Sequence, residues 1–141
     1  MNPTVRPDFV SFDEPRQEYV LYFVEDGPWP NRSESWRGLL TALQGRILDA
    51  VDAALDGGLA QAYPESIGQL VRIQVDSPSG EPQQVRELVN LVRQYLYEDP
   101  SYRAAIAGSA FVKGIRIVTG HELGRFQQAE GPVPREGPSP E

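Results

Sequence analysis

Residues 18–25 place the strongest constraint on what this chain can fold into. Six β-forming residues, Tyr-Val-Leu-Tyr-Phe-Val, follow one another there between two glutamates. In a strand both faces of this stretch are apolar, with Tyr19, Leu21 and Phe23 on one and Val20, Tyr22 and Val24 on the other. Such a strand is typical of the centre of a sheet, where each face is covered by a layer of the domain or by a partner.

The segments on either side of this strand predict a hairpin and a long helix. Val10 and Phe12 alternate with polar residues in a short edge strand, and residues 13–17 form a turn around Pro15. After the central strand, Asn31 and Glu34 match a helix N-cap and its capping-box partner. Apolar residues then recur at three- and four-residue steps until Gly57-Gly58 ends the helix.

The second half of the chain repeats the pattern of a strand followed by a helix. After a connection over residues 59–69, Val71, Ile73 and Val75 alternate with polar residues, which predicts a strand covered on one side and wet on the other. A second amphipathic helix opens at Pro82 and stops at residues 98–100. Residues 101–108 can add a helical turn, and residues 111–118 read as a final strand.

The predicted fold class is therefore α+β, in the order ββαβαβ, with a four-stranded mixed sheet. Right-handed crossovers place the two helices on one face of that sheet. The other face is then open, so we expect Val20, Tyr22 and Val24 to form an exposed apolar patch that a protein partner or a second copy of the chain would cover.

Composition divides the 141 residues into three parts. Residues 1–8 carry two prolines and read as a flexible N-terminal arm, and residues 9–126 form a single domain. Residues 127–141 are rich in proline, glycine and acid and are predicted to be disordered. Twelve of the 13 cations are arginine, which together with abundant alanine, glycine and proline is typical of a GC-rich bacterial genome.

Charge and cysteine content exclude several functions. The chain has no cysteine, so thiolate catalysis and thiol zinc sites are impossible. Its net charge of −7 argues against nucleic-acid binding. No apolar run is long enough to span a membrane and the start does not match a signal peptide, so we expect a cytoplasmic protein without a membrane partner.

The residues that could carry chemistry do not form a recognisable site. His121 is the only histidine and lies at the end of the last predicted strand, where a structural position is far commoner than a catalytic or metal-binding one. Asp49, Asp52 and Asp56 share a helix flank, which usually means a solvated face. We therefore predict no catalytic residue, no metal and no cofactor, and hence no enzyme.

One combination of residues resembles a small bacterial domain family of unknown function. The combination is a Val-Leu-Tyr-Phe-Val strand, an Asp26 and Trp29 turn, a Leu-Leu-x-x-Leu-Gln helix at residues 39–44, and a connection with Gly58-Leu59 and Tyr63-Pro64. It covers about residues 18–76. The resemblance implies an α+β module with no assigned reaction and no catalytic residues.

Three functional hypotheses follow. The first is a non-enzymatic protein-interaction module, for example an immunity or accessory protein, whose tentative contact residues are Val20, Tyr22, Val24 and Trp29. Trp29 is included because Pro28 and Pro30 would hold its turn ordered and exposed. The alternatives are a small-ligand or enzymatic cleft near Tyr63, Arg72 and His121, and a subunit of a secretion or phage-like assembly.

Overall fold

The computed structural model describes residues 6–123. Its strands are β1 (Phe9–Asp13), β2 (Glu18–Val24), β3 (Leu70–Asp76) and β4 (Gly114–Thr119). Its helices are α1 (Ser33–Asp56), α2 (Gly58–Ala62), α3 (Gln83–Glu98) and α4 (Pro100–Ala107), with short 3-10 turns η1 (Pro64–Ser66) and η2 (His121–Leu123). The tail predicted at residues 127–141 lies outside the described residues, as do residues 1–5 of the predicted arm.

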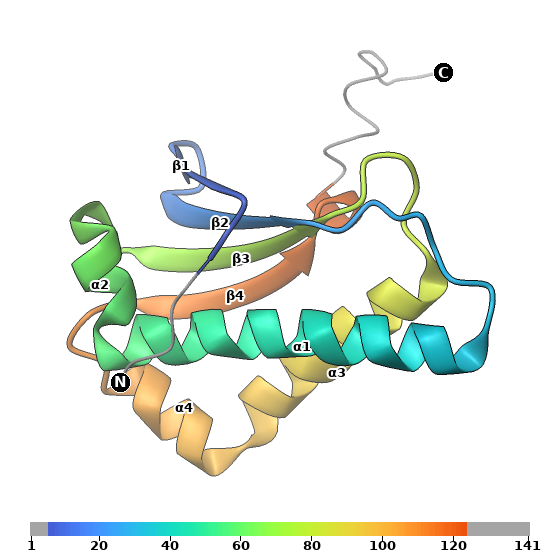
Figure 1. Ribbon diagram of the computed structural model, residues 1–141. Coiled ribbons are helices and arrows are strands. Elements are labelled where there is room, and N and C mark those ends of the chain that lie inside the picture. The colour runs from blue at the N-terminus through green and yellow to red at the C-terminus, as the bar shows by residue number, and fades with distance from the viewer. Residues whose placement is uncertain (1–5, 124–141) are drawn as a thin grey trace, which may run out of the picture.

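The α+β prediction is confirmed, and the sheet is mixed. The strand order is β1-β2-β3-β4, with β1 antiparallel to β2 and with β2, β3 and β4 parallel to one another. The two long helices make the crossovers between the parallel strands, and Figure 1 shows them on the same side of the sheet. The chain thus forms one helix layer on one strand layer.

The main core lies between the sheet and these helices. Leu21 and Phe23 of β2 and Ile73 of β3 are at most 1% exposed and belong to one cluster with Leu43 and Ile47 of α1. At the end of α1, Gly57 adopts a φ of 97°, and a Cβ there would lie 2.9 Å from the Phe111 ring. Glycine therefore both stops the helix and leaves room for Phe111 to pack.

Several local predictions need correction. Helix α1 begins at Ser33, and its N-cap is Arg32 without a side-chain cap bond, so Asn31 does not cap it. The connection over residues 59–69 contains α2 and η1. The last strand begins at Gly114, three residues later than predicted, because the backbone N–H groups of Phe111 and Val112 are bonded to the Ser109 hydroxyl in a turn.

The prediction that one face of the sheet is open also needs correction. Val20 and Tyr22 are 0% and 4% exposed within the single chain, and Val24 is half-buried. Both buried residues lie outside the main core cluster, so the sheet has a second buried face. Arg72 and Gln74, expected in water, are 2% and 0% exposed beside them. The argument that Val20 and Tyr22 need a partner to be covered therefore fails.

Among residues 6–123, no helix combines the length and the apolar character that crossing a bilayer requires.

Candidate functional site

The second face of the sheet is organised around the buried Arg72 of β3. Its Nη1 donates to Asp13 Oδ2 at 2.7 Å and to Glu18 Oε1 at 2.6 Å. Its Nε donates to Gln74 Oε1 at 2.9 Å. The side chain is only 2% exposed, and those of Asp13 and Glu18 are 13% and 7% exposed. Charge-assisted bonds to two carboxylates offset the cost of burying this guanidinium.

Two further arginines extend this arrangement at its ends. Arg16 donates to Asp13 Oδ2 at 3.2 Å, and Arg116 of β4 donates to Glu18 Oε2 at 2.8 Å. The charged groups therefore alternate, and we call them the ion-pair chain: Arg16, Asp13, Arg72, Glu18 and Arg116. The side chains of the two end arginines are 47% and 40% exposed. The ion-pair chain therefore begins and ends in solvent and passes through the protein interior between them.

The arginines determine the acidity of the two carboxylates. Burial by itself would raise the pKa of Glu18, but hydrogen bonds from Arg116 and Arg72 outweigh it and hold the pKa below its ordinary value. The pKa of Asp13 is also lowered, because bonds from Arg72 and Arg16 outweigh the effect of burial. Both groups are therefore ionised at neutral pH and bind their arginines as anions.

These shifts predict acid-sensitive stability. A carboxylate with a lowered folded-state pKa stabilises the fold above its unfolded value, and that contribution is lost as the pH falls from about 4 through the folded value. Urea unfolding at pH 7 and pH 3 should show a lower free energy of unfolding at pH 3. The drop should be smaller in Glu18→Gln, which cannot titrate at that position. An equal drop in the two proteins would contradict this assignment.

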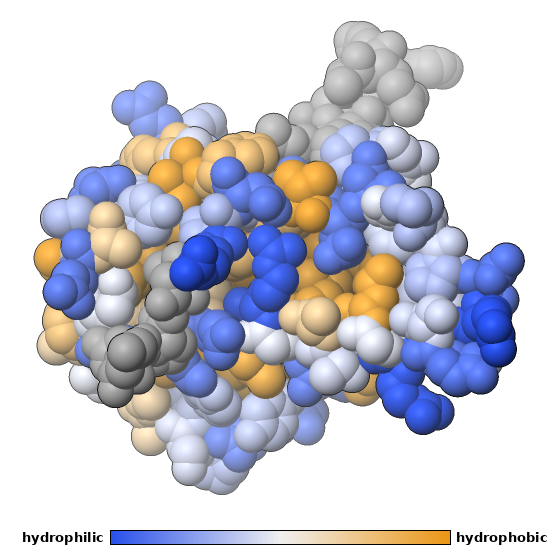
Figure 2. All heavy atoms as spheres, in the orientation of Figure 1, coloured by the Kyte–Doolittle hydropathy of each residue, from blue (hydrophilic) through white to orange (hydrophobic). Residues whose placement is uncertain are grey.

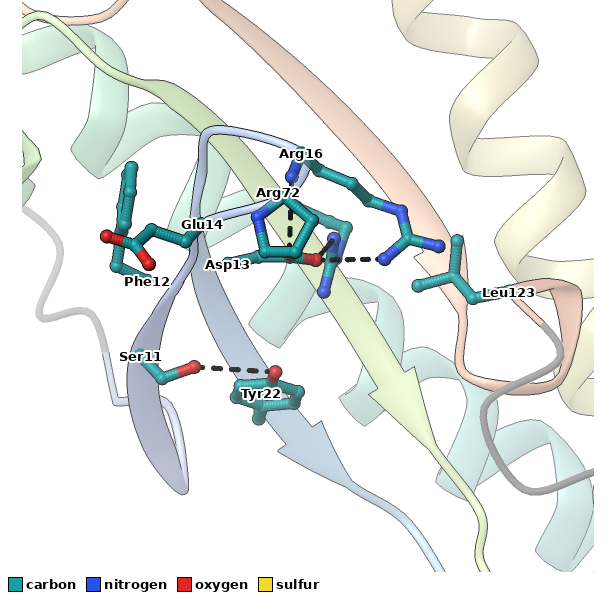
Figure 3. A pocket seen from close by; sticks show the side chains of 9 residues that line it. Ser11, Phe12, Asp13, Glu14, Arg16, Tyr22, Arg72 and Leu123 are labelled. Carbon is teal, nitrogen blue, oxygen red and sulfur yellow. Dashed lines mark hydrogen bonds and ion pairs between the residues drawn. The ribbon is translucent and has the colours of Figure 1, made fainter. Parts of the chain in front are cut away.

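A pocket of about 530 Å³ opens where the β1–β2 turn meets Arg72. Ser11, Asp13 and Arg16 line it from the hairpin, Arg72 from β3 and Leu123 from η2, and we call it the hairpin pocket. Figure 3 shows Arg16 and Arg72 gathered at Asp13, with Ser11 and Tyr22 below them and Leu123 at the right, beyond Arg16. The ion-pair chain thus reaches a concave, largely polar site.

A different, apolar groove lies on the helix layer. Its residues come from α1 and α3, its volume is about 260 Å³, and we call it the helix groove: Gln44, Leu48, Leu88, Leu91, Val92 and Tyr95. Gln44 also lines a neighbouring hollow of about 460 Å³ that includes Trp36 and Leu40. Figure 2 shows hydrophobic residues in patches among hydrophilic ones on the side of the molecule that α1 crosses.

Trp29, the fourth tentative contact residue, packs against the core. It is half-buried, and its ring stacks on that of Trp36 with centroids 5.7 Å apart and planes 8° from parallel. Its ring therefore braces the first turns of α1. A role of Trp29 in binding stays a prediction.

The cleft predicted near Tyr63, Arg72 and His121 does not form. Arg72 lines the hairpin pocket and His121 lines a separate one with Glu81, Arg86 and Glu122. Tyr63 packs on the other side of the sheet, where its ring lies 6.4 Å from that of Tyr19 in the main core. The Nε2 atom of His121 lies 3.1 Å from the Ser77 carbonyl oxygen. The sequence does not indicate which of Tyr63, Arg72 and His121 lie on the same face of the sheet.

The acidic flank of α1 has structural contacts. Asp52 accepts a hydrogen bond from the Tyr102 hydroxyl at 2.8 Å, and burial together with this bond raises the pKa of Tyr102 to about 12. Asp56 accepts from the Gly58 N–H at 2.8 Å, just past the helix end. Within residues 6–123, no group of three or more histidine or acidic residues is placed to hold a metal ion.

Comparison of the chain with family models, curated proteins and solved structures returns no match, so the resemblance to a bacterial domain family stays a prediction from its residues.

Proposed function

We propose that the chain is a non-enzymatic protein-interaction module whose helix groove binds an amphipathic helix of a partner protein. The observation that carries this proposal is the exposure of Leu91 and Tyr95, which are 63% and 50% exposed on α3 and line the groove. Large apolar side chains on the rim of an apolar groove are typical of surfaces that bind a helix. An immunity or accessory protein that masks another protein would need such a surface.

Charge favours a basic partner. On α3, Glu87 lies four residues before Leu91 and Glu98 lies three residues after Tyr95, so both acids flank the exposed apolar row. The two arginines of α3 are engaged elsewhere: Arg93 donates to the Ile117 carbonyl and to Glu122, and Arg86 pairs with Glu81 at 3.6 Å. With a net charge of −7 on the whole chain, lysines and arginines beside an apolar helix stripe complement this rim.

The same charges disfavour a second copy of the chain as the occupant. A two-fold interface brings equal surfaces together, so the acidic rim would face itself across the groove. The partner is therefore a different protein, and the homodimer considered from the sequence becomes an outcome that the experiment distinguishes.

A designed peptide tests the chemistry of the groove. The probe is an 18-residue amphipathic helix of leucine and lysine, and the reference is the same peptide with glutamate in place of lysine. Titration followed by amide NMR shifts should place the leucine-lysine peptide on α1 and α3 with a micromolar dissociation constant, and the glutamate peptide should bind at least tenfold more weakly.

Substitution of Leu91 identifies the anchor. Leu91→Ser should weaken binding of the leucine-lysine peptide roughly tenfold, because it removes an apolar contact without changing charge. The matched control is Ile67→Ser, since Ile67 is also exposed, at 52%, but lies before β3 and away from the groove. Equal binding by the two variants would contradict the proposal. A dimer in light scattering that Leu91→Ser dissociates would also contradict it, since the occupant would then be a second copy.

A further inference from the structure

The hairpin pocket lies on the opposite face of the sheet from the helix groove and has a different chemistry. Its lining comes from three strands, the hairpin turn and η2, so residues far apart in the sequence build it together. Its volume of about 530 Å³ falls within the range of pockets that hold small molecules. Its apolar lining residues are Phe12, Pro15 and Leu123, and its charged lining residues are Asp13, Glu14, Arg16 and Arg72.

Arg72 has one terminal nitrogen left for a ligand. Its Nε and Nη1 make all of its hydrogen bonds within the described residues, and Nη2 makes none there. The Ser66 hydroxyl is the one fully enclosed side-chain polar atom of those residues that lacks a partner, so Nη2 is not sealed in. Since Arg72 lines the pocket, a fixed, permanently charged donor faces it.

Two guanidinium groups of the ion-pair chain meet at the hairpin pocket. The ion-pair chain contains three guanidinium groups and two carboxylates, and an arginine stands at each end. Asp13 Oδ2 accepts from both Arg72 and Arg16, so these two cations share one carboxylate at the pocket. A ligand carboxylate placed beside them would accept hydrogen bonds from both guanidinium groups.

We infer that the hairpin pocket binds a small organic acid, with one carboxylate against Arg72 and Arg16 and an apolar body against Pro15 and Leu123. Glu14 also lines the pocket and is exposed, and its negative charge disfavours a ligand with two negative charges. A monocarboxylate therefore suits the site better than a phosphate dianion. The ligand class follows from charge and wall chemistry, independently of what the helix groove binds.

Phenylacetate is the probe, with two matched references. Phenylacetamide has nearly the same shape without the charge, and inorganic phosphate has the charge without the apolar body. In NMR titrations of the full chain, phenylacetate should shift the amides of β1, the turn and η2 with a dissociation constant of roughly 1 mM. The amide and phosphate should each bind at least fivefold more weakly. Failure of phenylacetate to saturate, or equal or tighter binding by either reference, would overturn the inference.

Two exposed substitutions locate the site without disturbing buried Arg72. Arg16→Gln should weaken phenylacetate binding at least fivefold, and Ser11→Phe should abolish it by filling the pocket. Arg103→Gln, which changes an exposed arginine on α4, should leave it unchanged. Unaltered binding in Arg16→Gln or Ser11→Phe would overturn the assignment. The leucine-lysine peptide should bind these variants normally, so failure of the pocket is distinguishable from failure of the helix groove.

Discussion

Arg72→Met is expected to lower the free energy of unfolding by about 3–5 kcal/mol. The substitution removes the cation that Asp13, Glu18 and Gln74 all contact, and it leaves their oxygens inside the protein. Methionine offers no N–H donor and does not fill the space of the guanidinium, so the loss combines weaker pairing of the buried acceptors with a cavity. Urea unfolding at pH 7, with circular dichroism as the signal, measures the change.

The control for this experiment is Arg103→Met, since Arg103 is exposed and should cost under about 0.5 kcal/mol. The double variant Arg72→Met with Glu18→Gln should lose less than the sum of the two single losses, because the buried charge and its missing partner are removed together. A loss for Arg72→Met no larger than that of the control would show that the ion-pair chain is not formed in solution.

The ion-pair chain also shows where prediction from the sequence stopped. The alternation of β3 correctly placed Arg72 and Gln74 on the face opposite Val71 and Ile73. An alternating strand with polar residues on one side usually has that side in water. Here the polar side chains find hydrogen-bond partners on strands that are distant in the sequence, and such a face can be buried.

A signal for this arrangement was present but incomplete. Glu18 opens the central strand and Arg116 interrupts an apolar run in β4, and both are unusual places for a charge in a parallel sheet. Only the register joins them. Glu18 of β2 pairs with Leu70 of β3, two residues before Arg72, and Arg72 pairs with Arg116 of β4. The register therefore places Glu18 diagonally across from Arg72, with Arg116 one strand further along the same diagonal side. The strand order and register could not be read from the sequence, and the site depends on both.

The helix groove was predicted from the sequence only in part. The amphipathic pattern predicted for the second helix is confirmed in α3, whose buried residues are Val85, Leu88, Val89, Val92 and Leu96. Leu91 and Tyr95 follow the same three- and four-residue spacing on the outer side, where they read as scattered surface residues. Leu91 and Tyr95 line a groove only because α1 lies beside them, where Gln44 and Leu48 supply the other wall. The packing of two helices against each other is a tertiary contact, and the periodicity of one helix does not predict it.

Phe23→Ala is expected to lower the free energy of unfolding by about 3–5 kcal/mol, through the loss of core packing. Phe23 is 1% exposed and belongs to the cluster that joins the sheet to α1. Its ring also has the Arg46 guanidinium 4.9 Å from its centroid, so the substitution removes a cation–π contact at the core's edge. Urea unfolding at pH 7 measures the change.

Phe12 supplies the matched control within the same sheet. It is 42% exposed on the edge strand β1, so Phe12→Ala should cost under about 1 kcal/mol. The sequence ranks them in the same order, because Phe12 lies in the predicted edge strand and Phe23 in the predicted central strand. A loss for Phe12→Ala that equals the loss for Phe23→Ala would mean that Phe12 is packed as tightly as the core, which its exposure of 42% contradicts.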